Sequence, residues 1–248
     1  MSGHSKWASI KHKKAAVDAK RGKVFTKVIR EITVAAKIGG GDPVTNPRLR
    51  TAIESAKDAN MPADNIDRAV KKGSGELEGV NYEEIVYEGY GPEGVAIYVQ
   101  CLTDNKNRTS SEIRNIFSKR NGNMAGAGSV AWIFEKKGLL VIDESATAED
   151  KLMEVILNAG ADDLSKLGNQ FEVLTDPHNF EAVKKALADA KIKCELASLQ
   201  MIPKNLVAAS ADHARQVLAL VDALEDHDDV QNVYTNCDFP PEVVKELQ

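Results

Sequence analysis

Apolar residues near the start of the chain recur with the spacing of an amphipathic α-helix. These positions are Phe25, Val28, Ile29, Ile32, Ala35 and Ala36. Lysine and arginine side chains project from nearly the opposite side of the predicted helix. The glycines and the proline of residues 39–43 are typical of a helix end, so the helix is expected to stop there.

Two shorter apolar stripes follow, and each suits one face of a short helix. The first helix is expected over residues 46–59, and the second begins near Pro62, which the first turn tolerates. Gly73 predicts the end of the second helix. The expected inward positions are Leu49, Ile53, Ala56, Ile66, Ala69 and Val70. Three short helices with one apolar face each predict a small bundle over residues 1–75.

Beyond this bundle the apolar pattern changes to period two, which predicts β-strands. Strands are expected at residues 84–90 and 95–102, on either side of a Gly/Pro turn. A helix is predicted over residues 107–120, with Ile113, Ile116 and Phe117 inward, and a further strand at 130–134.

Residues 138–202 have the pattern of a self-contained β-α-β-β-α-β unit. The strands are predicted at 139–142, 163–167, 171–175 and 194–201, and the helices at 148–158 and 177–190. Asp176 suits the N-cap of the second helix, with Pro177 in its first position. Gly168 and Asn169 suit a hairpin turn. Two βαβ halves in succession predict a ferredoxin-like sandwich.

A last helix at residues 211–225 and a strand at 230–235 supply elements that the middle of the chain lacks. We therefore predict a discontinuous middle domain, 76–135 plus 203–248, with residues 136–202 inserted into it. The predicted fold class is α+β and multidomain. An N-terminal three-helix bundle precedes two α/β-sandwich domains, one inserted into the other.

The charge of the chain is divided unevenly along its length. The 248 residues contain 32 Lys or Arg and 37 Asp or Glu, a net charge of −5, which by itself does not suggest a nucleic-acid partner. Residues 1–72, however, contain 16 basic and 7 acidic side chains, a net +9, and the remaining residues contain 16 and 30, a net −14. Such a division indicates a basic module with a polyanionic partner.

The basic module gives the main set of candidate binding residues. Lysine and arginine release counterions when they neutralise phosphates, and Trp7 offers a surface on which a base can stack. The alternative is a solvated helix face, with Trp7 anchored to the core. The predicted nucleic-acid-binding residues are Lys6, Trp7, Lys11, His12, Lys13, Lys14, Lys20, Arg21, Lys23, Lys27, Arg30, Arg48, Arg50, Arg68, Lys71 and Lys72.

A second polar cluster lies at a predicted strand-to-helix turn. Its members are Asp104, Asn105, Lys106, Asn107 and Arg108. Capping of the following helix by Asp104, Asn105 or Asn107 explains the cluster, and a phosphate held at the helix N-terminus by Lys106 and Arg108 explains it equally well. The two interpretations are compatible.

Other motifs give no constellation for catalysis, a metal or a cofactor. Residues 89–94 match G-x-G-x-x-G, but a strand follows them, whereas the dinucleotide fingerprint requires a helix; a hairpin turn is expected. Residues 126–131 are also expected to form a turn, with a mobile binding loop as the alternative. The acidic stretch around His227 is interpreted as a solvated loop, and the histidines lack metal-ligand spacing.

Composition also bears on the location of the chain. No apolar run is long enough to span a bilayer, and the N-terminus has no secretory signal. The three cysteines are odd in number and far apart, and they are expected to be reduced and on strands. These features predict a cytoplasmic protein without membrane attachment and without an evident small-molecule substrate.

Several motifs in order resemble the YebC/PmpR family, which includes the mitochondrial translational activator of cytochrome c oxidase subunit I. They are Gly3-His4-Ser5-Lys6-Trp7, Arg21-Gly22-Lys23 with Phe25, Asn60-Met61-Pro62 with Asp64-Asn65-Ile66, Tyr87-Glu88-Gly89-Tyr90-Gly91-Pro92, Leu102-Thr103-Asp104-Asn105 with Asn107-Arg108-Thr109, and Gly128-Ser129-Val130.

The resemblance implies a three-domain, non-enzymatic, cytoplasmic protein. It also implies a DNA-binding transcriptional regulator, with a ribosome-associated translational activator that binds ribosomal RNA as the alternative. The basic residues themselves do not decide between DNA and ribosomal RNA. A third reading, from another class, is an enzyme that uses the Gly-rich turns.

Overall fold

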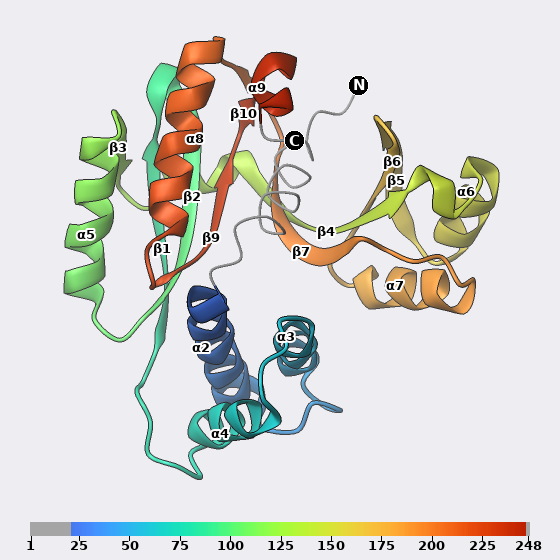
Figure 1. The fold of residues 1–248 in the computed structure, drawn as a ribbon, viewed down its shortest axis with the longest axis horizontal. Helices are drawn as coiled ribbons and strands as arrows, with labels where there is room; N and C mark the ends of the chain where they lie inside the picture. Colours follow the sequence, from blue (N-terminus) through green and yellow to red (C-terminus); the bar gives the residue numbers. More distant parts are fainter. Residues whose placement is uncertain (1–20, 247–248) are drawn as a thin grey trace. The chain divides into compact units, whose positions relative to one another are not determined.

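In the computed structural model of the protein, the described residues begin with three helices, and two four-stranded sheets with their helices follow (Figure 1). The structure describes residues 21–246. Within this range one compact unit contains residues 21–129 and 215–233, and the other contains residues 130–214 and 234–246. The predicted α+β class, with a helical N-terminal region followed by sheet domains, is confirmed.

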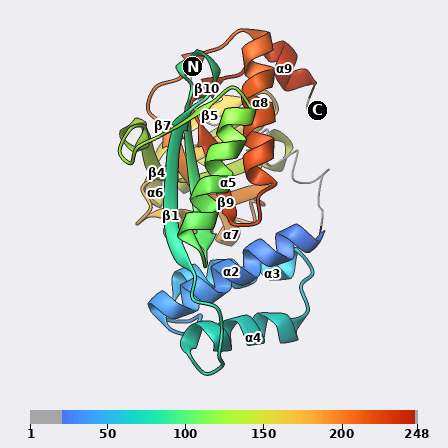
Figure 2. The same cartoon turned by 90° about the vertical axis from the view of Figure 1, so that its left-hand side faces the viewer.

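Three helices pack around a small apolar core in the first unit (Figure 2). They are α2 (Arg21–Gly39), α3 (Pro47–Asp58) and α4 (Ala63–Ser74). Every apolar position predicted to face inward lies in this core or packs against it. Asn46 ties the helices together: its side chain accepts a hydrogen bond from the Leu49 amide at 3.1 Å and donates to the Ala35 carbonyl at 2.8 Å.

Gly73 does not end α4, and this prediction is wrong. The helix continues to Ser74, and Gly75, with a φ of 85°, takes the left-handed conformation that ends it. Gly73 is instead where α4 crosses α2, because a Cβ atom there would lie 2.3 Å from the Thr33 carbonyl oxygen and 2.7 Å from the Ala36 Cβ. The glycine is therefore required by close helix packing.

The sheet of the first unit combines strands from distant parts of the chain. Its order is β3-β1-β2-β9, with β1 (Glu83–Tyr90), β2 (Ala96–Thr103), β3 (Asn123–Ala125) and β9 (Val230–Thr235). The antiparallel β1–β2 pair confirms the predicted hairpin, and the 3₁₀ turn η1 (Pro92–Gly94) closes it. The place of β9 beside β2 confirms that the last strand completes this sheet.

Two helices of this unit run antiparallel to each other in front of the sheet (Figure 2). They are α5 (Lys106–Lys119) and α8 (Ala211–Glu225). Near one end Asn121 donates to Gln216 at 3.2 Å, and near the other His227 lies 2.8 Å from Glu112. Most of the predicted inward residues of both helices are buried, with Phe117 and Val221 fully so, whereas Ile116 is only half-buried.

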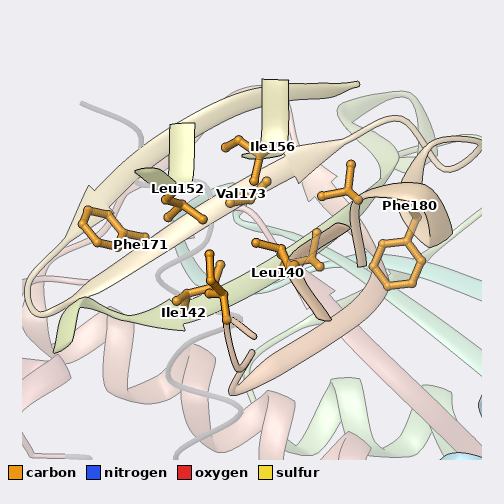
Figure 3. Close-up of a cluster of buried hydrophobic side chains, with 10 residues drawn as sticks. Leu140, Ile142, Leu152, Ile156, Phe171, Val173 and Phe180 are labelled. Carbon is orange, nitrogen blue, oxygen red and sulfur yellow. The ribbon is translucent and has the colours of Figure 1, made fainter. Parts of the chain in front are cut away.

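The sheet of the second unit has the order β5-β6-β4-β7 and is antiparallel throughout. The bounds are β4 (Phe134–Asp143), α6 (Glu149–Asn158), β5 (Ala161–Leu167), β6 (Gln170–Thr175), α7 (Phe180–Asp189) and β7 (Leu196–Pro203). Because the first strand of the βαββαβ order lies between the third and the fourth, this is the predicted ferredoxin-like arrangement. Figure 3 shows Leu140 and Ile142 of β4 packed with side chains of α6 and β6.

Two predicted boundaries in this unit are wrong. Residues 130–134 and 139–142 are not separate strands: Ala131–Ile133 forms a 3₁₀ turn, and β4 then runs without a break through Gly138. Gly138 is needed there because a Cβ atom would lie 2.5 Å from the Phe180 ring. The helix expected from Pro177 begins at Phe180, because Asp176 accepts the His178 amide and forms a turn first.

Shorter elements complete the described chain. Strands β8 (Val207–Ala208) and β10 (Cys237–Asp238) form a parallel pair, η3 (Glu144–Ala146) follows β4, and α9 (Pro241–Lys245) lies near the end. Cys101 and Cys237 lie on strands as predicted, whereas Cys194 precedes β7, which corrects the expected start of that strand at residue 194. Burial raises the pKa of the Cys101 thiol to about 12, so this thiol is inert.

Within residues 21–246, no helix is both long enough and apolar enough to cross a membrane. The domain boundaries at residues 75, 135 and 202 stay predictions.

Replacing Gly73 with alanine tests the close crossing of α2 and α4. Helix propensity alone predicts a gain in stability, because alanine favours helices over glycine. The geometry predicts a loss of about 2 kcal/mol in the stability of the bundle, because the added methyl group overlaps the Thr33 carbonyl. Amide hydrogen exchange is expected to accelerate in α2 and α4. Gly126→Ala, where a Cβ would meet nothing within 4 Å, is the control; unchanged or slower exchange in Gly73→Ala would contradict the role of the glycine.

Candidate nucleic-acid interface

The most basic part of the predicted binding set lies outside the described residues. This applies to Lys6, Trp7, Lys11, His12, Lys13, Lys14 and Lys20. Arg21 begins α2, but its side chain is not described either. Of the predicted binding residues, those from Lys23 onward have described side chains.

Three basic side chains of α2 contact one loop of the same unit, residues 225–229, which we call the acidic loop. Lys23 donates to the carbonyl and to the carboxylate of Asp226, both at 2.9 Å. Lys27 donates to the Glu225 carbonyl at 2.7 Å. Arg30 donates to the Asp228 carbonyl at 2.7 Å and forms an ion pair with Asp229 at 2.5 Å. The basic face of α2 thus meets acceptors supplied by the chain itself.

Asp229 is the centre of this contact and joins the two predicted polar sites. Its side chain is only 3% exposed. One oxygen binds Arg30, from the basic helix, and the other accepts from Arg108, from the second polar cluster, at 2.9 Å. The hydroxyls of Thr109 and Thr103 lie 2.6 Å and 3.1 Å from that second oxygen. Two arginines and two hydroxyls therefore surround one buried carboxylate.

This environment keeps Asp229 ionised. Burial by itself would raise the pKa of the carboxyl group, because it removes water from the charged form. Hydrogen bonds from Thr109, Arg108 and Arg30, together with the positive charge of Arg30, outweigh burial and lower the pKa to about 2. Asp229 is a permanent anion at neutral pH, and sequence reasoning missed it by treating its loop as solvated.

The second polar cluster caps the N-terminus of α5 and supplies one of the arginines that bind Asp229. Asn105 is the N-cap of α5 and accepts the Arg108 amide at 3.1 Å. The Arg108 side chain binds Asp229 and Asp104, and these hydrogen bonds raise its pKa above the usual range. Lys106 and Asn107 are exposed. The capping interpretation is confirmed, whereas Arg108 is occupied by carboxylates and is not poised for a phosphate.

His227 lies in the same network and corrects the picture of a solvated loop. Its Nδ1 accepts the Asp229 amide at 3.1 Å, so its Nε2 is the donor to Glu112 at 2.8 Å. Glu112, His227 and Asp229 offer ligand atoms within 4.8 Å of one another. A metal ion there would have to displace the hydrogen bonds of both Asp229 and His227, next to the two arginines, which makes this a poor cation site.

The other predicted basic residues are spread over α3 and α4. Arg48 forms ion pairs with Glu31, at 2.6 Å, and with Glu84. Burial would lower the pKa of Arg48, but the hydrogen bonds and charges of these carboxylates raise it above the usual range. Arg50 donates to the Pro43 carbonyl and Lys71 pairs with Asp67. The remaining two, on α4, are exposed: Arg68 and Lys72.

Neither glycine-rich segment forms a dinucleotide loop. Residues 89–94 form the β1–β2 hairpin, as expected. In the segment 126–131, the Gly128 amide donates to Glu88 at 2.7 Å, and Tyr90 donates to the Ser129 carbonyl at 3.0 Å. A carboxylate already uses the amide that a phosphate would need, and neither segment opens an α-helix.

Two family models match the chain over most of its length. The model "TACO1/YebC protein N-terminal domain" matches residues 5–76, and "TACO1/YebC second and third domain" matches residues 82–237. The chain belongs to the TACO1/YebC family. The predicted resemblance is confirmed, and the family's second and third domains contain both sheets described above.

Full-length relatives support this membership. A "Probable transcriptional regulatory protein" of Geobacter sulfurreducens is 59% identical over 247 residues, 100% of both chains. One of the same description from Desulfatibacillum aliphaticivorans is 58% identical over 99% of this chain and 100% of its own. The crystal structure of a conserved hypothetical protein from Aquifex aeolicus, 45% identical, superposes with a TM-score of 0.82 over 92% of this chain and 94% of its own. Two of these three relatives thus carry a regulatory name.

Replacing Asp229 with asparagine tests the carboxylate network. The change leaves Arg30, whose side chain is 13% exposed, without its anionic partner. We expect the free energy of unfolding to fall by about 3 kcal/mol, the usual loss when one member of a buried ion pair is removed. Denaturant unfolding measures it. Asp228→Asn is the matched control, because its exposed side chain undergoes the same change of charge; equal losses in the two variants would contradict a special role for Asp229.

The low pKa of Asp229 also predicts a pH dependence. The folded-state value is about 2, whereas an unfolded aspartate titrates near pH 3.9, about two units higher. The ionised form therefore contributes about 3 kcal/mol that is fully present above about pH 5 and disappears as the pH falls toward 2. The stability difference between the native chain and Asp229→Asn is expected to shrink over this interval when unfolding is measured at several pH values. A difference that stays constant from about pH 6 to pH 3 would refute the ionised network.

Proposed function

We propose that this chain is a non-enzymatic regulator of gene expression that binds nucleic acid in the cytoplasm. Duplex DNA is the proposed partner. The basic segment before α2 and the helical bundle form the proposed binding region. The two sheet domains carry no binding residues in this proposal, and their negative charge disfavours phosphate elsewhere on the protein.

The uneven charge distribution is the observation that carries the proposal. Residues 1–72 have a net charge of +9 and the remainder −14. A dense set of cations gains affinity for a phosphate backbone by releasing counterions. The regulatory names of relatives that match the whole chain agree with such a role.

The described part of the bundle adds cations to this region. Arg68 and Lys72 lie one turn apart on α4 and are exposed, so they can reach a phosphate without breaking an internal contact that involves α2. Arg48, by contrast, is held between Glu31 and Glu84. We therefore place Arg68 and Lys72 in the binding surface and give Arg48 a structural role.

Ribosomal RNA is the alternative partner, and the resemblance to a translational activator favours it. The same cations would bind either nucleic acid, because both present phosphates. Sedimentation of a native lysate on a sucrose gradient separates the two: co-migration with ribosomes supports the RNA partner. Protein that stays at the top at low salt, and that shifts duplex DNA with sequence preference, supports the DNA partner.

Charge reversal in the basic segment tests the binding region. We expect Lys11, Lys13 and Lys14 changed together to glutamate to weaken nucleic-acid binding at least tenfold and to flatten its salt dependence, because three phosphate contacts are lost. Fluorescence anisotropy over a salt series measures both quantities.

The matched control changes three exposed lysines of the ferredoxin-like unit to glutamate. They are Lys151, Lys185 and Lys193. Because this variant has the same net charge, it separates a local contact from a general electrostatic effect. Equal affinities of the two triple variants would overturn the assignment of binding to the basic segment.

A further inference from the structure

In the contact between α2 and the acidic loop, oxygen atoms of the protein bind the cations of α2 as phosphate oxygens would. Lys23, Lys27 and Arg30 are spaced at i, i+4 and i+7, so their side chains share one face of α2. All three point to acceptors within residues 225–229. This is the face that the proposed function needs for phosphate.

The acceptors resemble phosphate oxygens in their chemistry. The acidic loop presents backbone carbonyls of Glu225, Asp226 and Asp228, and carboxylates of Asp226 and Asp229. It also begins at Glu225, the last residue of α8, where the helix dipole is negative. A lysine ammonium group can donate to these oxygens or to phosphate. Because it has three N–H donors, hydrogen bonds to one partner reduce the number left for the other.

The contact is not equally strong along its length. Arg30 and Asp229 are 13% and 3% exposed, so their ion pair is shielded from water. Lys23 and Asp226 are 40% and 62% exposed, and a solvated pair of this kind contributes only about 0.2–1 kcal/mol. One end of the contact is therefore fixed, and the other can open at small cost.

We propose that the acidic loop is an internal competitor for nucleic-acid phosphates on α2. Nucleic acid reaches Lys23 and Lys27 by displacing Asp226 and the Glu225 carbonyl, while Arg30 stays bound to Asp229. This inference rests on the proposed nucleic-acid binding and adds its regulation. The competition lowers affinity for every phosphate backbone, so only a ligand that makes further contacts displaces the loop.

A pair of single substitutions tests the competition. Asp226→Asn weakens the contact with Lys23, whereas Asp228→Asn makes the same change of charge at a residue that meets α2 through its backbone carbonyl. Binding of each full-length variant to a short labelled DNA duplex and to a ribosomal RNA fragment is measured at low salt. We expect Asp226→Asn to bind about two- to fivefold more tightly than Asp228→Asn, the factor that corresponds to a solvated ion pair.

A double variant identifies the side chain that is released. In a Lys23→Met background the Asp226→Asn change is expected to give no gain in affinity over Asp228→Asn, because the cation that it frees is absent. A gain that persists in this background would show that Lys23 is not the released contact and would overturn the proposal.

The remaining outcomes separate this proposal from the proposed function. Equal affinities of Asp226→Asn and Asp228→Asn, in a chain whose binding is lost on reversal of Lys11, Lys13 and Lys14, would overturn the competition and leave nucleic-acid binding intact. Absence of binding to both probes by the native chain and by Asp226→Asn would refute both. Thermal unfolding of the two single variants within about 1 °C of each other is expected, because exposed pairs contribute little to stability.

Discussion

A carboxylate buried away from water needs positive charges and hydrogen-bond donors in place of the lost water. In this protein that requirement connects four elements of the first unit. Asp229 stands immediately before β9 and takes its compensation from Arg30 of α2, Thr103 at the end of β2, and Arg108 and Thr109 of α5. Its backbone carbonyl also accepts the Leu102 amide at 2.8 Å. Removing either arginine leaves the negative charge of Asp229 less well balanced, and removing either hydroxyl leaves the carboxylate one hydrogen bond short. Electrostatics and hydrogen bonding, as well as apolar packing, therefore hold these elements together.

Local patterns were sufficient to predict most of the elements. The apolar stripe of α2 continues over several helical turns, and every inward position that it indicated lies in the bundle core or packs against it. The two βαβ halves of residues 138–202 predicted the ferredoxin-like sheet, because the order of strands in such a unit leaves few topologies. Two of the errors lie at glycines. Gly73 was predicted to end α4, and a strand was predicted to begin after Gly138 and not to run through it; each glycine is required by a close neighbour, Thr33 or Phe180, that only the tertiary structure supplies.

The candidate site was less accessible to sequence reasoning, because its contacts are long-range. Arg30 and Asp229 are 199 residues apart, and Arg108 and Asp229 are 121 apart. Nothing in the stretch Asp226-His227-Asp228-Asp229 distinguishes a buried aspartate from its exposed neighbours. Both the basic helix and the polar cluster after β2 nevertheless contain residues that converge on this carboxylate, whereas their role in nucleic-acid binding stays a prediction.

The structure shows where the basic and acidic parts of the chain meet within the first unit. A net +9 beside a net −14 suggested two modules, one attracting phosphate and the other repelling it. In the first unit the two charges are in direct contact, so part of the positive charge of α2 is already neutralised. Under the proposed function, the cations most useful for binding are then those outside this contact together with those at its exposed end. That exposed end, at Lys23, is also the end of α2 from which the sequence continues into its most basic stretch. A polyanion attracted by that stretch would therefore meet the weakest internal ion pair first, and Asp229 would hold the bundle in place while the exchange occurs.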